Sequence, residues 1–289
     1  MCYIFKSMKT NRLLNAGDTI ALGTPIFTPY LEMPHLEDYD LKIVNIQSTQ
    51  ENRWQFDDAE LDKLLDPKIK AFFLVNPGNP SAVALSAKTI AKIGAIIKKR
   101  PDLILLTDDV YGTFVPGFRS LLGAFPYNTI GVYSYSKYFG CTGWRLGVIA
   151  VHEDNLFDKL IAQHPEPVLK KIDKRYSALT LEPRKMRFID RIVADSRDVA
   201  LNHTAGLSLP QQVMMMLFSL YELMDTKKHY QQACMGIVKK RVEATLEGLG
   251  IEVPANELHD NYYGLIDFEF WARKNLGEDV VTWMKENVH

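Results

Sequence analysis

Short apolar runs alternate with longer amphipathic stretches through the first half of the chain. The apolar runs predict strands at 18–23, 41–46, 71–75, 103–108, 129–136 and 145–151. Helical spacing of leucines predicts a helix at 56–65, and the stretch 86–100 predicts another, with Ser86 as its N-cap and a basic last turn. Strands and helices in this alternation predict parallel strands joined by crossovers. Because the strands are nearly continuous apolar runs, we expect an α/β fold with a sheet covered on both faces.

Beyond residue 151 the pattern becomes helical. The expected elements are helices at 182–196, 210–224 and 227–249, a strand at 262–270, and a final helix from about residue 271. We place a soft domain boundary near residue 226. Residues 1–226 then form a large domain with a mostly parallel central sheet, and residues 227–289 form the start of a smaller α+β domain that ends before it is complete.

Composition narrows the classes of function. Of 289 residues, 47% are hydrophobic and 24% are charged, and the net charge is −1, which is typical of a soluble globular protein. Without a basic excess or a long apolar stretch, we expect neither nucleic acid nor membrane as a partner. Cys2, Cys141 and Cys234 are widely spaced and form no metal-binding pattern, so we expect no metal. Reduced thiols and no secretory signal indicate a cytoplasmic protein.

Three of the predicted strands end in polar residues of distinctive type. Asn79 follows the strand at 71–75, Asp108 ends the strand at 103–108 with Tyr111 close behind it, and Lys137 follows the strand at 129–136. Taken singly, these are a turn residue, a helix cap, a core aromatic and a surface lysine. In an open α/β sheet, however, ligands bind outside the carboxyl ends of the strands. The order and spacing of these residues therefore favour one shared pocket.

The motifs around these residues resemble those of the aspartate aminotransferase superfamily, the pyridoxal 5'-phosphate enzymes of fold type I. The matching blocks are Asn76-Pro77-Gly78-Asn79-Pro80-Ser81-Ala82, Asp108-Asp109-Val110-Tyr111, Ser134-Tyr135-Ser136-Lys137 and Gly143-Trp144-Arg145-Leu146-Gly147. The upstream segment GDTIALGTPIFTPY is similar to the strand and Pro-x-aromatic segment of the same family. One departure is Ser81-Ala82, where the family has Thr-Gly. The resemblance implies the fold of these enzymes and their cofactor.

The resemblance also implies a role for each residue at the ring of the cofactor. Lys137 is the catalytic residue, whose amine forms a Schiff base with the cofactor aldehyde and later moves protons at the substrate. Asp108 pairs with the pyridine nitrogen and keeps it protonated. Asn79 and Tyr111 hydrogen-bond the phenolic oxygen and stabilise its anionic form.

Further residues are implied around the phosphate and the substrate. Arg145 and Ser134 hold the phosphate, because a guanidinium suits a bidentate grip on it. Phe27 stands where a ring stacks on the cofactor. Arg197 is a speculative contact for a substrate carboxylate, and a solvated arginine is the ordinary interpretation.

Within the superfamily, the chain looks like the aspartate 4-decarboxylases, which convert L-aspartate to L-alanine and CO2 and also transaminate aspartate. The segments that carry this likeness are 76–86, 107–121, 133–155 and 197–220. The family also implies a homodimer or larger homo-oligomer with active sites at the subunit interface. Members of the family have a further N-terminal region and a C-terminal arginine for the substrate α-carboxylate, for which we find no match. We therefore expect an internal fragment with little or no decarboxylase activity of its own.

Three alternatives stay open at this point. The first is an ordinary class I or II aminotransferase that acts on another amino acid. The second is an aminotransferase-like binding module of a transcription regulator, although this neutral chain has no basic winged-helix segment. The third is a non-catalytic remnant that oligomerises with intact subunits. A nicotinamide-binding domain is disfavoured, because no G-x-G-x-x-G follows a predicted strand.

Overall fold

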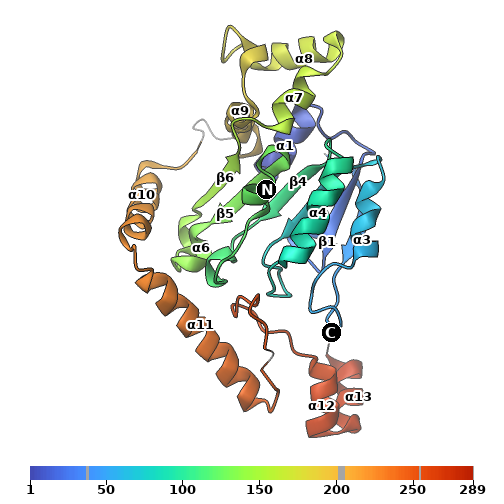
Figure 1. Ribbon diagram of the computed structural model, residues 1–289, viewed down its shortest axis with the longest axis vertical. Coiled ribbons are helices and arrows are strands. Elements are labelled where there is room, and N and C mark those ends of the chain that lie inside the picture. The colour runs from blue at the N-terminus through green and yellow to red at the C-terminus, as the bar shows by residue number, and fades with distance from the viewer. Residues whose placement is uncertain (37–38, 201–205, 254, 289) are drawn as a thin grey trace.

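The protein is described by a computed structural model that covers residues 1–36, 39–200, 206–253 and 255–288. Its centre is a six-stranded sheet in the order β2-β1-β3-β4-β5-β6 (Figure 1). The strands are β1 Thr19–Thr24, β2 Lys42–Gln47, β3 Ile69–Val75, β4 Ile104–Asp108, β5 Thr129–Ser134 and β6 Gly147–Val151. Neighbouring strands from β2 to β5 run parallel, and β6 is antiparallel to β5. The mostly parallel sheet that the sequence predicts is therefore confirmed.

Helices pack on both faces of the sheet. One face carries α1 Cys2–Thr10, α7 Leu156–Ala162, α8 Glu166–Tyr176 and α9 Phe188–Ala200, and the other carries α3 Asp58–Asp62 and α4 Ala87–Lys99. Successive side chains of β3 point to opposite faces of the sheet. Phe73 packs in the core beneath α1, α7, α8 and α9, and Phe72 packs in the core beneath α3 and α4. Both rings are fully buried, and each burial stabilises the fold by about 1.5–3 kcal/mol. The apolar run of this strand is thus explained by contacts with helices on both faces of the sheet.

The predicted start of α4 is confirmed in detail. Ser86 is its N-cap, and the Ser86 Oγ accepts a hydrogen bond from Thr89 N at 3.1 Å. Lys98 and Lys99 lie in the last turn, where positive charge interacts favourably with the helix dipole. Residues of the helix and its N-cap thus stabilise both of its ends.

A buried carboxylate connects three helices on the first face. Asp195 of α9 is 1% exposed, and its Oδ2 accepts hydrogen bonds from Ser7 Oγ of α1 at 2.9 Å and from Tyr176 Oη of α8 at 2.8 Å. Its Oδ1 accepts from the Arg175 guanidinium at 2.9 and 3.0 Å. Because a buried charge is stable only when it is paired and hydrogen-bonded, these contacts hold α1 against α8 and α9.

The last third of the chain is helical and extends away from the sheet (Figure 1). It contains α10 Leu209–Met224, α11 His229–Gly248, α12 Phe268–Leu276 and α13 Glu278–Asn287. Helix α10 is attached to the body by stacking of Phe218 on Phe139, with ring centroids 4.7 Å apart. Much of its apolar surface is exposed, including Leu209, Val213, Met216, Leu217, Leu220, Tyr221, Leu223 and Met224. The soft boundary near residue 226 falls between α10 and α11 and stays a prediction.

The strand predicted at 262–270 is wrong. Residues 262–267 form neither strand nor helix, and α12 begins at Phe268, earlier than the predicted residue 271. Instead of pairing in a sheet, the segment before α12 is attached to the turn that follows β3, where Asp260 N donates to Ala82 O at 2.8 Å. A contact between residues so distant in sequence overrides the local apolar pattern.

Short helices connect these elements. They are α2 Pro29–Glu32, α5 Leu121–Ala124 and α6 Tyr135–Tyr138, with 3-10 helices at Met33–His35, Lys63–Leu65, Gly112–Phe114, Pro126–Asn128, Thr142–Trp144 and Pro183–Lys185.

Within the described part of the chain, no helix has both the length and the apolar character that crossing a membrane requires.

Candidate active site

The three strand ends singled out by sequence meet at one edge of the sheet. Val75, the last residue of β3, pairs with Asp108, the last residue of β4, and Asp108 pairs in turn with Val132 of β5. Backbone hydrogen bonds continue this register beyond the strands, from Asn76 N to Asp108 O at 2.9 Å and from Asp109 N to Val132 O at 2.8 Å. The loops that follow β3, β4 and β5 therefore start side by side.

Asp108 is a buried carboxylate that already accepts two hydrogen bonds. Tyr30 Oη donates to Oδ2 at 2.7 Å, and Val110 N donates to Oδ1 at 3.2 Å. Burial raises the pKa of Asp108, while these bonds and the charge of the Met1 amine oppose the rise. Because each carboxylate oxygen has a second lone pair, Asp108 can accept a further hydrogen bond from a ligand. Such a carboxylate is suited to a protonated ring nitrogen.

A cluster of tyrosines joins the loops after β3 and β4. The hydroxyl oxygens of Tyr111 and Tyr263 lie 2.6 Å apart, and Asn79 Nδ2 donates to Tyr263 Oη at 3.5 Å. The rings of Tyr111 and Tyr262 have centroids 5.1 Å apart. Burial raises the pKa of Tyr111. The structure thus brings Asn79 and Tyr111 together, and adds two residues that sequence reasoning missed.

Lys137 lies on α6, directly after β5. Ser134 Oγ caps this short helix by accepting a hydrogen bond from Ser136 N at 3.2 Å. The side chain of Lys137 is partly buried, and its Nζ is 5.9 Å from the ring centroid of Tyr262. The same ring contacts Tyr111. Lys137 and Tyr111 therefore border one aromatic side chain, and the ring attracts the ammonium group through its π face.

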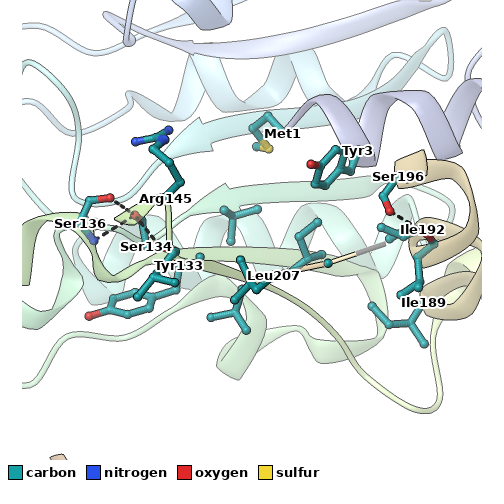
Figure 2. A pocket seen from close by; sticks show the side chains of 17 residues that line it. Met1, Tyr3, Tyr133, Ser134, Ser136, Arg145, Ile189, Ile192, Ser196 and Leu207 are labelled. Carbon is teal, nitrogen blue, oxygen red and sulfur yellow. Dashed lines mark hydrogen bonds between the residues drawn. The ribbon is translucent and has the colours of Figure 1, made fainter. Parts of the chain in front are cut away.

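A cavity of about 540 Å³ lies beside β5 and β6 (Figure 2). Arg145, Ser134, Ser136 and Met1 are among its lining residues. Ser134 Oγ donates to Ser136 Oγ at 2.9 Å, and Arg145 Nη1 donates to Thr142 O at 3.1 Å. A guanidinium and two hydroxyls gathered at one end of a cavity form a donor set that fits a phosphate. Ser136 directly precedes Lys137 on α6, so this end of the cavity lies beside that short helix.

The turn that carries Arg145 has an unusual backbone. Arg145 has φ of 54°, in the left-handed region, which costs a residue with a side chain about 1–2 kcal/mol. A few residues on, a Cβ added to Gly147 would lie 3.2 Å from the carbonyl oxygen of Tyr133, so the backbones approach closely there. This turn places the exposed guanidinium of Arg145 at the cavity.

Among the described residues, Phe27 and Arg197 form no hydrogen bond, ion pair or ring contact with the other candidate residues. Phe27 is 44% exposed, and its ring packs edge-on against Tyr30 with centroids 5.3 Å apart. Tyr30 in turn donates a hydrogen bond to Asp108 and so links Phe27 to that carboxylate. Arg197 is exposed in the last turn of α9, next to Ser196, which lines the cavity. Residues 201–205, which belong to the likeness at 197–220, lie outside the described residues. The roles of Phe27 and Arg197 stay predictions.

Comparison with known proteins identifies the family. The profile of the family "Aminotransferase class I and II" matches residues 9–182. The chain belongs to this family. Over 98% of its length it is 51% identical to a bifunctional aspartate aminotransferase and L-aspartate beta-decarboxylase of Pseudomonas sp, of which it covers 54%. The chain thus spans about half the length of this curated relative.

Solved structures show the same fold. Cystalysin from Treponema denticola, whose crystals contain pyridoxal 5'-phosphate, has a TM-score of 0.56 and 16% identity, over 86% of this chain and 54% of that one. An alanine aminotransferase from Pyrococcus furiosus has a TM-score of 0.54 and 21% identity, over 89% of this chain and 55% of that one. At such identities the likeness concerns the fold, and it confirms the predicted α/β fold of the aspartate aminotransferase type.

Proposed function

We propose that this site binds pyridoxal 5'-phosphate and that Lys137 holds its aldehyde covalently. The convergence of Asp108, Tyr111 and Lys137 at one edge of the sheet carries the proposal, since Asp108 neighbours β5 in the sheet and Tyr111 and Lys137 border one tyrosine ring. When bound, this cofactor supplies an electron sink for bonds broken at the amino acid. Asp108 keeps its ring nitrogen protonated, and Asn79 and Tyr111 donate to its phenolic oxygen.

The phosphate is proposed to lie at the end of the cavity that Arg145 and Ser134 line. The Arg145 guanidinium provides charge and paired N–H groups, and the hydroxyl of Ser134 provides a further donor. The first turn of α1 faces the same cavity through Met1 and Tyr3, and helix N-termini attract anions. With the phosphate held there, the rest of the cofactor can extend toward Lys137 and Asp108.

The reaction we propose is β-decarboxylation of L-aspartate, with transamination as a side reaction. The bifunctional relative at 51% identity supports this choice over an ordinary aminotransferase. The β-carboxylate leaves as CO2, its bonding electrons stay on the β-carbon, and a proton taken up there completes L-alanine. Lys137 is the proposed base that moves the proton at the α-carbon. Arg197 remains the candidate contact for a substrate carboxylate.

Because the chain covers only 54% of that relative, we propose full turnover only where the residues equivalent to the rest of it are also present. The test uses L-aspartate labelled in its β-carboxyl group, with the cofactor added. Labelled CO2 together with alanine supports the proposal, whereas a keto acid without labelled CO2 favours an ordinary aminotransferase. For the 289 residues alone we expect little CO2. Sustained release by this chain would contradict that expectation.

We also propose that the protein forms a homo-oligomer and resides in the cytoplasm. The exposed apolar surface of α10 supports association, since large exposed apolar patches commonly mark interaction surfaces. The three cysteines are free thiols, as is usual in a reducing compartment. Sedimentation of the purified protein tests the first proposal, and a single species at the mass of one chain would contradict it.

A further inference from the structure

The segment before α12 is fixed onto the turn that carries Asn79. Ala84 N donates to Leu258 O at 2.8 Å, and Asp260 N donates to Ala82 O at 2.8 Å. Asp260 Oδ1 then accepts a hydrogen bond from Tyr262 N at 2.7 Å. The first two bonds hold the backbone of residues 258–260 against the turn that follows β3, and the third fixes the backbone at Tyr262. They determine where the following side chain, Tyr263, enters the site.

Tyr263 lies between the two residues proposed to face the phenolic oxygen of the cofactor. Its Oη accepts from Asn79 Nδ2 at 3.5 Å and lies 2.6 Å from Tyr111 Oη. At this distance one hydroxyl donates its proton to the oxygen of the other. The proton of the accepting hydroxyl then stays free for a third group. A hydroxyl that accepts one hydrogen bond becomes a better donor for the next. Because Tyr263 accepts from Asn79, we take Tyr263 as the donor and Tyr111 as the acceptor of the bond between them. The Tyr111 proton is then the free one.

We propose that Tyr263 is a positioning residue that acts through Tyr111, an inference that rests on the proposed function. Its hydroxyl donates to Tyr111 Oη, orients the Tyr111 proton toward the phenolic oxygen of the cofactor, and strengthens that donation, because hydrogen bonds in a chain polarise one another. The second N–H of Asn79 stays available for the same oxygen. A residue from the C-terminal third of the chain thereby completes the ring end of the site.

A double-mutant cycle tests this role. The variants are Tyr263→Phe, Tyr111→Phe and the two combined, and the readout is the Kd for pyridoxal 5'-phosphate from its visible absorption band. One hydrogen bond corresponds to about 0.5–1.5 kcal/mol, so Tyr263→Phe should weaken binding about two- to tenfold. In the Tyr111→Phe background the same change should have almost no effect, since its partner is gone. Equal losses in both backgrounds, no loss, or tighter binding would overturn the inference.

A spectroscopic readout separates this role from a merely structural one. A hydrogen bond to the phenolic oxygen favours its anionic form, so weaker donation should make the bound cofactor keep its proton to higher pH. We expect the pH midpoint of the visible band to rise in Tyr263→Phe and to stay unchanged in Tyr221→Phe, because Tyr221 lies on α10 and is 51% exposed. An unchanged midpoint in Tyr263→Phe counts against the role. If the wild-type protein shows no band that Lys137→Ala removes, the proposed function itself fails.

Discussion

Replacing Asp260 by asparagine should change the way in which stability depends on pH. The Asp260 side chain is fully buried, its Oδ1 accepts a hydrogen bond from Tyr262 N, and its Oδ2 has no hydrogen-bond partner among the described residues. Burial raises the pKa of Asp260 to about 8. In the unfolded chain the pKa of an aspartate is about 3.9. The folded protein therefore binds a proton that the unfolded chain releases.

The sign and size of the effect follow from this difference. Between about pH 4 and pH 8 the folded state holds more protons, so the free energy of unfolding falls as pH rises, by up to about 1.4 kcal/mol per pH unit. From pH 5 to pH 7, the raised pKa of Asp260 therefore lowers the free energy of unfolding by about 3 kcal/mol. Asparagine keeps the acceptor for Tyr262 N and has no proton to lose, so Asp260→Asn should remove this loss.

The assay is urea unfolding of both proteins at pH 5, 6 and 7. We expect the stability advantage of Asp260→Asn over the wild type to grow by about 3 kcal/mol from pH 5 to pH 7, because the other titratable groups are common to both proteins. Glu257→Gln is the matched control, since Glu257 is exposed and close in sequence. Parallel pH profiles for wild type and Asp260→Asn would contradict a raised pKa of Asp260, and so would a similar change in Glu257→Gln.

Three further predictions concern the phosphate, the ring nitrogen and the helices that support the site. Arg145→Ala should weaken pyridoxal 5'-phosphate binding about 10- to 100-fold in a spectroscopic titration, because hydrogen bonds to charged groups are worth about 1.5–3 kcal/mol; unchanged binding would remove Arg145 from the site. Asp108→Ala should slow exchange of the α-hydrogen of L-aspartate in D2O, followed by NMR, by at least about 100-fold, and an exchange rate like that of the wild type would contradict its role. Asp195→Ala should lower the free energy of unfolding by about 1–3 kcal/mol in urea, because it leaves the buried hydroxyls of Ser7 and Tyr176 without their acceptor, while Arg175 keeps its ion pair with Asp198; a loss below about 0.5 kcal/mol would show that this network does not hold α1 in place.

The sheet, and the meeting of the candidate residues at one of its edges, follow largely from the sequence. Apolar runs that end in Asp108 or just before Lys137 predict buried strands with polar side chains at their carboxyl ends, and parallel strands bring these ends to one edge. The capping serine at position 86 likewise marks the start of α4 correctly. These features depend on local pattern and on the geometry of a parallel sheet, which a single sequence carries.

The contributions of the C-terminal third could not be predicted in the same way. Tyr263 reaches Tyr111 across 152 positions, through backbone bonds that leave no local periodicity. The run at 262–270 has strand-like composition, but its backbone is attached at Asp260 to a turn instead of a sheet. Helix α10 follows from its sequence, yet the exposure of its apolar side chains depends on how it is attached through Phe218. Such features come from tertiary contacts alone.

Lys137 is proposed to capture the aldehyde of pyridoxal 5'-phosphate. Borohydride reduction of the protein mixed with the cofactor, followed by digestion and mass spectrometry, tests it directly because reduction makes the bond permanent. We predict that the adduct is found on the peptide that contains Lys137 and is lost in Lys137→Ala. An adduct spread evenly over other lysines, or one that persists in Lys137→Ala, would show that Lys137 is not the residue that binds the aldehyde.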